Sequence, residues 1–195
     1  LLGGHRYLRL DDQLRITERL DSLDTTTPGT FDISDSFDTE NRFNGGEIGL
    51  LFEVQRRRWS IELLTKIALG TTQQVVTING QTTSDEAGDV ITEPGGLLAQ
   101  RTNMGTFETN QFSVVPELGV TVGYQLTSHM RLNVGYTMIY WSGVARAGDQ
   151  IDLDVNPNLL PPETVPFTGP ARPEFNLVES DFWAQGLNAG VDIRW

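Results

Sequence analysis

The sequence has no cysteine, only two histidines and few basic residues, and each scarcity excludes a class of protein. Without cysteine, neither a disulfide scaffold nor a thiolate metal site is possible. The 14 lysines and arginines are outnumbered by 26 aspartates and glutamates, so the net charge is −12. Nucleic acid is not an expected partner, because phosphate binding requires a basic surface stripe. No apolar run reaches the roughly 18 residues of a membrane-spanning helix.

Residues 112–141 show a clear pattern. Apolar side chains alternate with small or polar ones on both sides of Thr127, Ser128 and His129, which predicts an antiparallel hairpin with a tight turn. The first strand rises roughly 28 Å at a tilt near 45°, close to the ~25 Å apolar band of an outer-membrane barrel. Rings at both ends suit two headgroup levels, and the predicted aromatic girdle is Trp59, Phe112, Tyr124, Tyr140, Trp183 and Trp195.

The same alternation predicts about seven strands: 3–10, 14–23, 42–55, 59–78, 112–124, 130–141 and 181–195. The first two are predicted to form a hairpin that turns at Asp11 and Asp12. Three long loops are predicted at 24–41, 79–111 and 142–180, and six of the nine prolines lie in the third. Most acidic residues fall in or beside these loops.

Short turns that alternate with long loops predict an all-β, antiparallel, up-and-down transmembrane β-barrel with short periplasmic turns and long outer loops. We expect residues 1–195 to form a single outer-membrane domain. Because barrels normally have an even number of strands, seven imply at least one more strand upstream of Leu1. A signal peptide is also expected upstream.

An internal repeat supports the strand assignment. Residues 47–55 and 117–125 align over nine positions, with a glutamate first, a glycine two residues later and a glutamine at the end. Coincidence between two amphipathic strands is the alternative explanation.

Charged residues on the inward face are the main candidate site. We expect the lumen-lining charges to be Glu47, Glu53, Glu62, Lys66, Glu117, Arg131, Asp192 and Arg194. They could fill the interior as ion pairs or line a conducting constriction. Strand number decides between these alternatives, because about eight strands leave a filled interior and sixteen or more leave a channel.

Other chemistry has weaker support. Asp149, Asp152 and Asp154 could hold Ca²⁺, although a solvated acidic loop is the preferred interpretation. His5 with Ser142 or Ser180 is the least implausible hydrolase pair, but the sequence places no carboxylate to orient the histidine. We therefore expect no catalytic residue, no metal and no cofactor.

Several segments resemble a known family: FNGGEIGLLFEVQRRRWSIELLTKIALG, PGGLLAQRTNMG, FSVVPELGVTVGYQLT, GYTMIYWSGVARAGDQIDLDVNP and DFWAQGLNAGVDIRW. Together they are similar to a bacterial β-barrel porin family of outer-membrane proteins, nearly throughout the chain. The sequence departs from that pattern at Ala147 and at Trp195. The resemblance implies that the chain is the C-terminal part of an outer-membrane barrel.

The favoured function is a porin-like passive diffusion channel for small solutes or ions, with acidic outer loops that attract cations. The alternative is a closed structural or surface-interaction barrel, and a soluble lipocalin-like barrel is a third possibility. Expected partners are outer-membrane lipid and the barrel assembly machinery, which would meet the C-terminal strand at Trp195. The oligomeric state cannot be inferred from the sequence.

Overall fold

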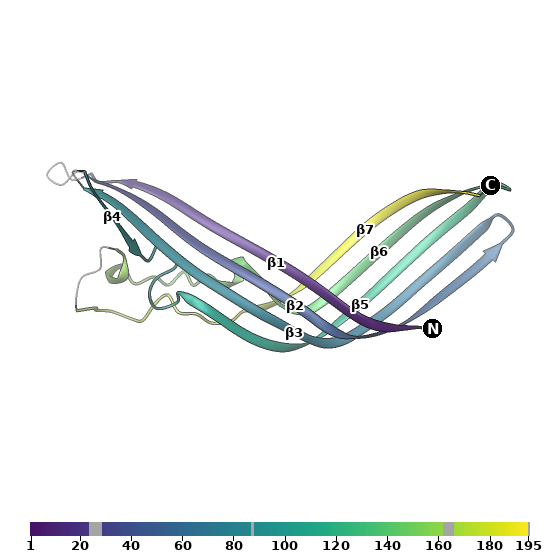
Figure 1. Cartoon of the computed structure of the whole chain (residues 1–195), viewed down its shortest axis with the longest axis horizontal. Coiled ribbons are helices and arrows are strands. Elements are labelled where there is room, and N and C mark those ends of the chain that lie inside the picture. Colours follow the sequence, from purple (N-terminus) through teal and green to yellow (C-terminus); the bar gives the residue numbers. More distant parts are fainter. Residues whose placement is uncertain (24–28, 87, 162–165, 195) are drawn as a thin grey trace.

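A computed structural model of the chain describes residues 1–23, 29–86, 88–161 and 166–194. It contains one antiparallel sheet (Figure 1). Its seven strands are β1 (Leu2–Asp21), β2 (Gly29–Arg56), β3 (Trp59–Glu86), β4 (Asp89–Pro94), β5 (Gly105–Thr127), β6 (Met130–Ala145) and β7 (Glu179–Ile193). Two short 3₁₀ helices, η1 (Ala147–Gln150) and η2 (Pro157–Leu159), lie between β6 and β7. No helix in the described ranges is long and apolar enough to cross a membrane.

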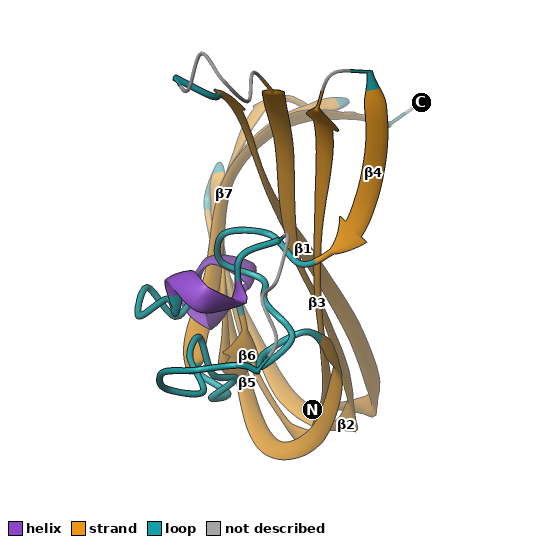
Figure 2. Ribbon diagram, turned by 90° about the vertical axis from the view of Figure 1, so that its left-hand side faces the viewer, coloured by secondary structure: helices purple, strands orange, loops and turns teal. Residues whose placement is uncertain are grey.

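The strands pair in the order β1-β2-β3-β5-β6-β7, and β4 pairs with β3. Two strands, β5 and β4, pair with different parts of the same edge of β3. Its first part, Trp59 to Ile78, pairs with β5, and Gln81 to Glu86 pair with β4. The sheet curls without closing, since β1 has no partner other than β2 and β7 none other than β6 in the described ladders. Figure 2 shows this curvature from the end that carries the long connections.

The predicted hairpin at residues 112–141 is confirmed, with a turn at Ser128 and His129 between β5 and β6. The predicted strands 42–55 and 59–78 are joined by a tight turn at Arg57 and Arg58, and Arg57 adopts a positive φ of 57°. Both turns lie at the end of the sheet that also holds the two chain ends (Figure 1). The long connections gather at the opposite end.

The predicted turn at Asp11 and Asp12 is wrong. Both residues lie within the continuous strand β1 and pair in register with Glu40 and Thr39 of β2. The Asp12 carboxylate is occupied by contacts with Arg146 and the Ala147 N–H. A polar pair that is satisfied in this way does not need to leave the ladder.

Two of the predicted loops are mostly strand. Residues 29–41 belong to β2, while 24–28 lie outside the described residues. In the 79–111 segment, β3 continues to Glu86, β4 follows at Asp89, and β5 begins at Gly105, so Gly88 and residues 95–104 are the described parts of this segment outside strands. The third loop is confirmed in substance, because no strand lies between Ala145 and Glu179 in the described parts.

The number of strands matches the prediction, but their identity does not. Two predicted strands are one, and β4 was not predicted. Six strands therefore form the main path, and β1 starts at the end of the short turns. An upstream strand was inferred because seven is an odd number, and six strands on the main path no longer require it. The existence of that strand stays a prediction.

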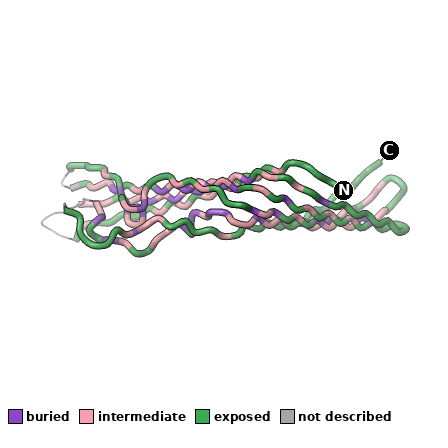
Figure 3. The backbone as a smooth tube through the Cα atoms, turned by 90° about the horizontal axis from the view of Figure 1, so that it is seen from below, coloured by how far each residue is buried: buried purple, intermediate pink, exposed green. Residues whose placement is uncertain are grey.

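The convex face changes character along the strands. Near the short turns it exposes large apolar side chains, such as Ile48 (64% exposed), Val134 (58%) and Leu187 (82%). A row of register partners, Tyr7, Asn44, Thr71 and Phe112, marks the boundary. Beyond this row, the outward side chains are mostly polar. Buried residues concentrate in the middle and in the half with long connections (Figure 3).

Candidate functional site

A charged cluster lies on the concave face in the half of the sheet with the short turns. Arg6 on β1 donates from Nε to Oε2 of Glu47 on β2 over 2.7 Å, and a second Arg6 nitrogen donates to Glu117 on β5. Lys66 on β3 places Nζ 3.9 Å from Oε1 of Glu47. The four side chains are 12–21% exposed, so they are partly desolvated and still reach open space.

Arg6 and Glu117 meet although β2 and β3 lie between their strands in the sheet. Only a strongly curved sheet brings side chains so close across its concave side. Both glutamates that begin the internal repeat bind the same arginine. The repeat therefore has a shared structural role, although the sequence did not single out Arg6 itself. The alternation could not have indicated it, because Arg6 has the parity of Leu8 and Leu10, the apolar face that the predicted orientation turns toward lipid, whereas Leu8 and Leu10 pack inward in the structure.

The other predicted lumen charges are dispersed. Glu62 is half-buried on the concave face, whereas Glu53 and Arg194 are exposed near the short turns. Arg131 donates to the Ser60 hydroxyl. The Asp192 carboxylate accepts a hydrogen bond from the Asn133 side chain over 2.6 Å. The structure thus unites Glu47, Lys66 and Glu117 and does not add the remaining charges to them.

The predicted girdle residues fall at two levels. Trp59 and Tyr124 are register partners beside the short turns, with ring centroids 4.7 Å apart. Tyr140 and Trp183 pair in register at the other level, and Phe112 lies on the boundary row, 64% exposed. Trp195 lies outside the described residues.

Farther along the sheet, residues 95–104 fold inward over the concave face. The carboxylate of Asp35, a residue that is 1% exposed, accepts hydrogen bonds from the backbone N–H groups of Leu97, Leu98 and Ala99 at 2.9–3.2 Å. Three converging N–H groups satisfy a buried carboxylate that would otherwise be costly to desolvate. Asp35 therefore fixes this segment inside the curve.

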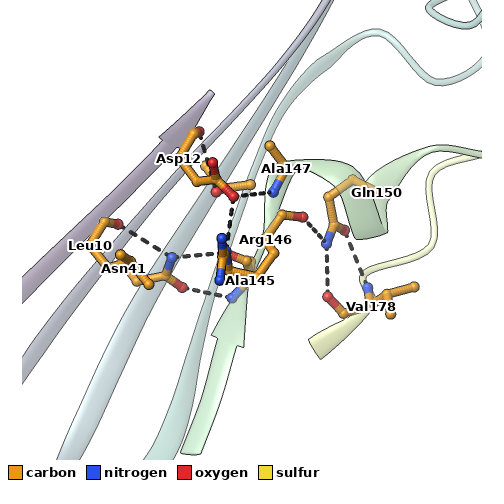
Figure 4. Close-up of polar contacts among 9 residues, drawn as sticks. Leu10, Asp12, Asn41, Ala145, Arg146, Ala147, Gln150 and Val178 are labelled. Atoms are coloured by element: carbon orange, nitrogen blue, oxygen red, sulfur yellow. Dashed lines mark hydrogen bonds and ion pairs between the residues drawn. The ribbon is translucent and has the colours of Figure 1, made fainter. Parts of the chain in front are cut away.

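The start of the 146–178 segment is fastened in a similar way (Figure 4). The Asn41 side chain bonds both backbone groups of Ala145, donating to the carbonyl over 2.8 Å and accepting from the N–H over 2.7 Å. Arg146 donates from Nε to Asp12 over 2.9 Å, and this hydrogen bond holds the pKa of the Asp12 carboxyl below its ordinary value. Gln150 likewise bonds both backbone groups of Val178.

Apolar side chains fill the concave side of the sheet around the hydrogen bonds of Asp35, Asn41 and Asp12. One cluster joins Phe43, Ala68, Val115, Trp141 and Val144, with Leu8 and Leu10 packed against it. A second cluster, nearer the long connections, joins strand residues to the inward segments and consists of Phe37, Val76, Ile78, Ala99, Ala145 and Ala147. In the middle of the sheet and in the half with the long connections, the concave side is therefore a packed core and not an open cavity.

One family model matches the whole length of this sequence. The family model described as "Putative beta barrel porin-7 (BBP7)" matches residues 1–195. The chain belongs to the BBP7 family. Its curved antiparallel sheet agrees with that description. Searches of curated proteins and of solved structures returned no match.

The weaker candidate sites of this BBP7 chain do not assemble. Asp152 accepts from Arg172 over 2.8 Å and from the backbone N–H of Glu174, and no group of three potential metal ligands occurs among the described residues. The N–H groups of Glu174 and Asp154, together with Arg172, lower the pKa of Asp152. His5 is exposed and has no hydrogen bond to Ser142 or Ser180 in the described part of the BBP7 chain.

Proposed function

We propose that this chain forms the wall of a bacterial outer-membrane barrel that acts as a porin-like passive channel for small solutes or ions. The observation that carries the proposal is the opposite chemistry of the two faces of the same strands. The convex face exposes apolar side chains such as Leu118 and Leu187, and the concave face carries Arg6, Glu47 and Glu117. A lipid-embedded barrel with a polar lumen requires this orientation.

The dimensions of the apolar band support a membrane location. From Trp59 to the boundary residue Thr71 is twelve steps of β3, which at about 3.3 Å each and a 45° tilt rise roughly 28 Å. The aromatic levels at Trp59 and at Tyr140 suit two headgroup regions. A lipocalin-like barrel would direct its apolar residues inward, whereas in the half with the short turns the large apolar side chains face outward.

In a membrane, the free edges of β1 and β7 require partners. Unpaired backbone groups cost several kcal/mol each in hydrocarbon, so a spanning sheet has to close. The two edges run antiparallel to each other, because the main path has six strands that alternate in direction. An even number of additional strands, from the same protein or from a second copy, would complete the ladder.

The charged cluster supports a conducting lumen. Ion pairs that are partly exposed line the concave wall where it passes through the apolar band, and acidic residues dominate the half beyond it. An acidic entrance raises the local cation concentration, and charges along a pore wall select among ions. We therefore expect a preference for cations.

Single-channel recording tests this proposal. The full-length protein is refolded in detergent and added to a planar bilayer, and stepwise currents are expected, with a reversal potential in a salt gradient that indicates cation preference. Detergent micelles without protein serve as the control. Partition of the refolded protein into water without detergent would contradict the membrane location.

A closed structural barrel is the second candidate, and the packed interior favours it. The two apolar clusters, together with the links from Asn41 to Ala145 and from Asp12 to Arg146, span the curve from one side to the other. Persistent absence of current steps from protein that is verified as inserted would select this candidate. The membrane location would then stand while the channel function fails.

A further inference from the structure

The tight turn between β2 and β3 carries three adjacent arginines. Arg56 ends β2, Arg57 and Arg58 form the turn, and all three are exposed. None of the three guanidinium groups has an ion pair or a hydrogen bond with a described residue. Arg6 and Arg146, by contrast, are paired with carboxylates. The turn therefore presents three positive charges that the described part of the chain leaves without a counter-ion.

The backbone of the turn does not by itself explain these residues. Arg57 adopts a φ of 57°, a conformation in which two-residue hairpin turns favour glycine, asparagine or aspartate. The backbone N–H of Gln125 donates to the Arg58 carbonyl over 2.7 Å, which ties the turn to β5. An arginine at a position where the backbone favours other residue types points to a use for its charge.

The ladder places this charge at the end of the apolar band. Arg56 and Trp59 are register partners, and Trp59 in turn pairs with Tyr124. Register partners share one face of a sheet, so Arg56 lies on the convex face beside the Trp59 and Tyr124 rings, whose centroids are 4.7 Å apart. Aromatic rings of this kind settle at the headgroup level of a membrane. In the proposed membrane, the arginines therefore lie at the headgroup level on the side of the short turns (Figure 1).

No acidic residue on the same face neutralises these arginines. Between the boundary row and the short turns, no aspartate or glutamate of the described strands has the convex parity. The nearest carboxylates along the chain, those of Glu53 and Glu62, belong to register partners on the concave face. A counter-charge on the convex face therefore has to come from outside the described chain.

We propose that the arginine turn, residues 56–58, binds the phosphate of an anionic phospholipid headgroup in the leaflet on the side of the short turns. Guanidinium groups pair with phosphate oxygens in a forked, bidentate geometry, and clustered basic residues at a membrane surface attract anionic lipids. The inference rests on the membrane location in the proposed function, and it does not depend on whether the barrel conducts.

Quenching of tryptophan fluorescence by brominated lipids tests the proposal, because Trp59 lies directly opposite Arg56 in the ladder. The full chain is refolded into phosphatidylcholine vesicles that contain increasing fractions of brominated phosphatidylglycerol, and the control series contains brominated phosphatidylcholine. The signal of Trp59 is the part of the quenching that is lost in Trp59→Phe. Half-maximal quenching of Trp59 is expected at an about fivefold lower fraction of the anionic lipid than of the neutral one.

A triple variant locates the site on the turn. It carries Arg56→Gln, Arg57→Gln and Arg58→Gln, which remove the charges and keep a side chain of similar length at the position with positive φ. The variant is expected to quench equally with the two brominated lipids, because the attraction to the phosphate is lost. Its quenching by brominated phosphatidylcholine should match that of the unmodified protein, which shows that the variant is inserted.

The matched control carries Arg9→Gln, Arg15→Gln and Arg19→Gln. These arginines have the convex parity of β1 beyond the boundary row, so the control loses the same three charges away from the short turns and should keep the preference. Equal half-quenching fractions for the two lipids in the unmodified protein, or the same loss in both triple variants, would overturn the lipid site while the membrane location stands. Absence of Trp59 quenching by either lipid would overturn both.

Discussion

Arg6 and Glu117 form an ion pair across the concave face, although two strands separate their own strands in the sheet. The same guanidinium also binds Glu47, so one cation neutralises two carboxylates that would otherwise repel each other. Arg6 therefore contributes both to the stability of the curved sheet and to the charge of its concave face.

Arg6→Ala should destabilise the barrel by about 2 kcal/mol, because the partly desolvated Glu117 loses its ion pair with Arg6 and Glu47 keeps only the longer contact with Lys66. In a conducting barrel it should also increase cation preference. Denaturant unfolding in micelles measures the first effect and the reversal potential measures the second. Arg9→Ala is the control, because Arg9 is exposed on the opposite face of β1. Equal unfolding midpoints for the two variants would contradict the importance of the Arg6 pairs.

Asn41→Ala should cost about 2–4 kcal/mol, since it removes hydrogen bonds from both backbone groups of Ala145 and leaves them buried. Proteolysis within the 146–178 segment should also accelerate. Asn44→Ala changes an exposed amide on the same strand and should have little effect. If both variants unfold and are cleaved like the unmodified protein, Asn41 does not hold the segment.

The contact between Asp12 and Arg146 should make the inward segment sensitive to acid. Because Arg146 lowers the pKa of Asp12 in the folded state, the stabilisation is complete above the ordinary aspartate pKa of about 3.9 and disappears as the pH falls through the lowered value. The unfolding midpoint, followed from pH 6 downward, should decrease less steeply in Asp12→Asn. A pH profile of Asp12→Asn that parallels the unmodified profile would exclude this contribution.

Gly80→Ala should destabilise the protein by about 2 kcal/mol. A Cβ at this position would lie 2.2 Å from the Ala99 carbonyl oxygen and 2.6 Å from the Gly96 nitrogen, so the 95–104 segment could not keep its place. Gly46→Ala is the control, because a Cβ at Gly46 would have no atom of the described residues within 4 Å. Thermal unfolding of both variants checks the difference.

Leu187→Arg should strongly reduce insertion into lipid vesicles. Through the ladder, Leu187 lies level with Leu63, near the centre of the apolar band, where an arginine costs about 2–4 kcal/mol. Val75→Arg places the same charge on β3 beyond the boundary row and should insert normally. Comparable insertion yields for the two variants would contradict the lipid-facing assignment.

The sequence predicted the hairpin of β5 and β6 because its apolar alternation is unbroken and its turn is short. It failed for β2, where Asp32, Asp35 and Asp38 have the composition of a loop. Their strand is stabilised by long-range pairing with β1 and β3, and Asp35 is satisfied by backbone groups more than 60 residues away. A local pattern contains no record of such partners.

The candidate site was partly predictable from the alternation of side chains along the strands. Parity placed Glu47, Lys66 and Glu117 on one face, and the structure brings them together. The role of Arg6 depends on curvature, which alternation does not encode. The inward course of residues 95–104 also depends on Asp35, whose position on β2 was assigned to a loop.

The length of β2 and β3 has a consequence for biogenesis in the proposed orientation. Each strand has 28 residues, of which roughly half lie beyond the apolar band. If insertion proceeds from the periplasm, this polar half has to be translocated through hydrocarbon before it reaches water again. If this half were already folded, moving its charged side chains, such as Asp32 and Asp38, through hydrocarbon would cost a large desolvation free energy. Packing around Phe37 is therefore expected to be the last step of assembly, completed on the far side.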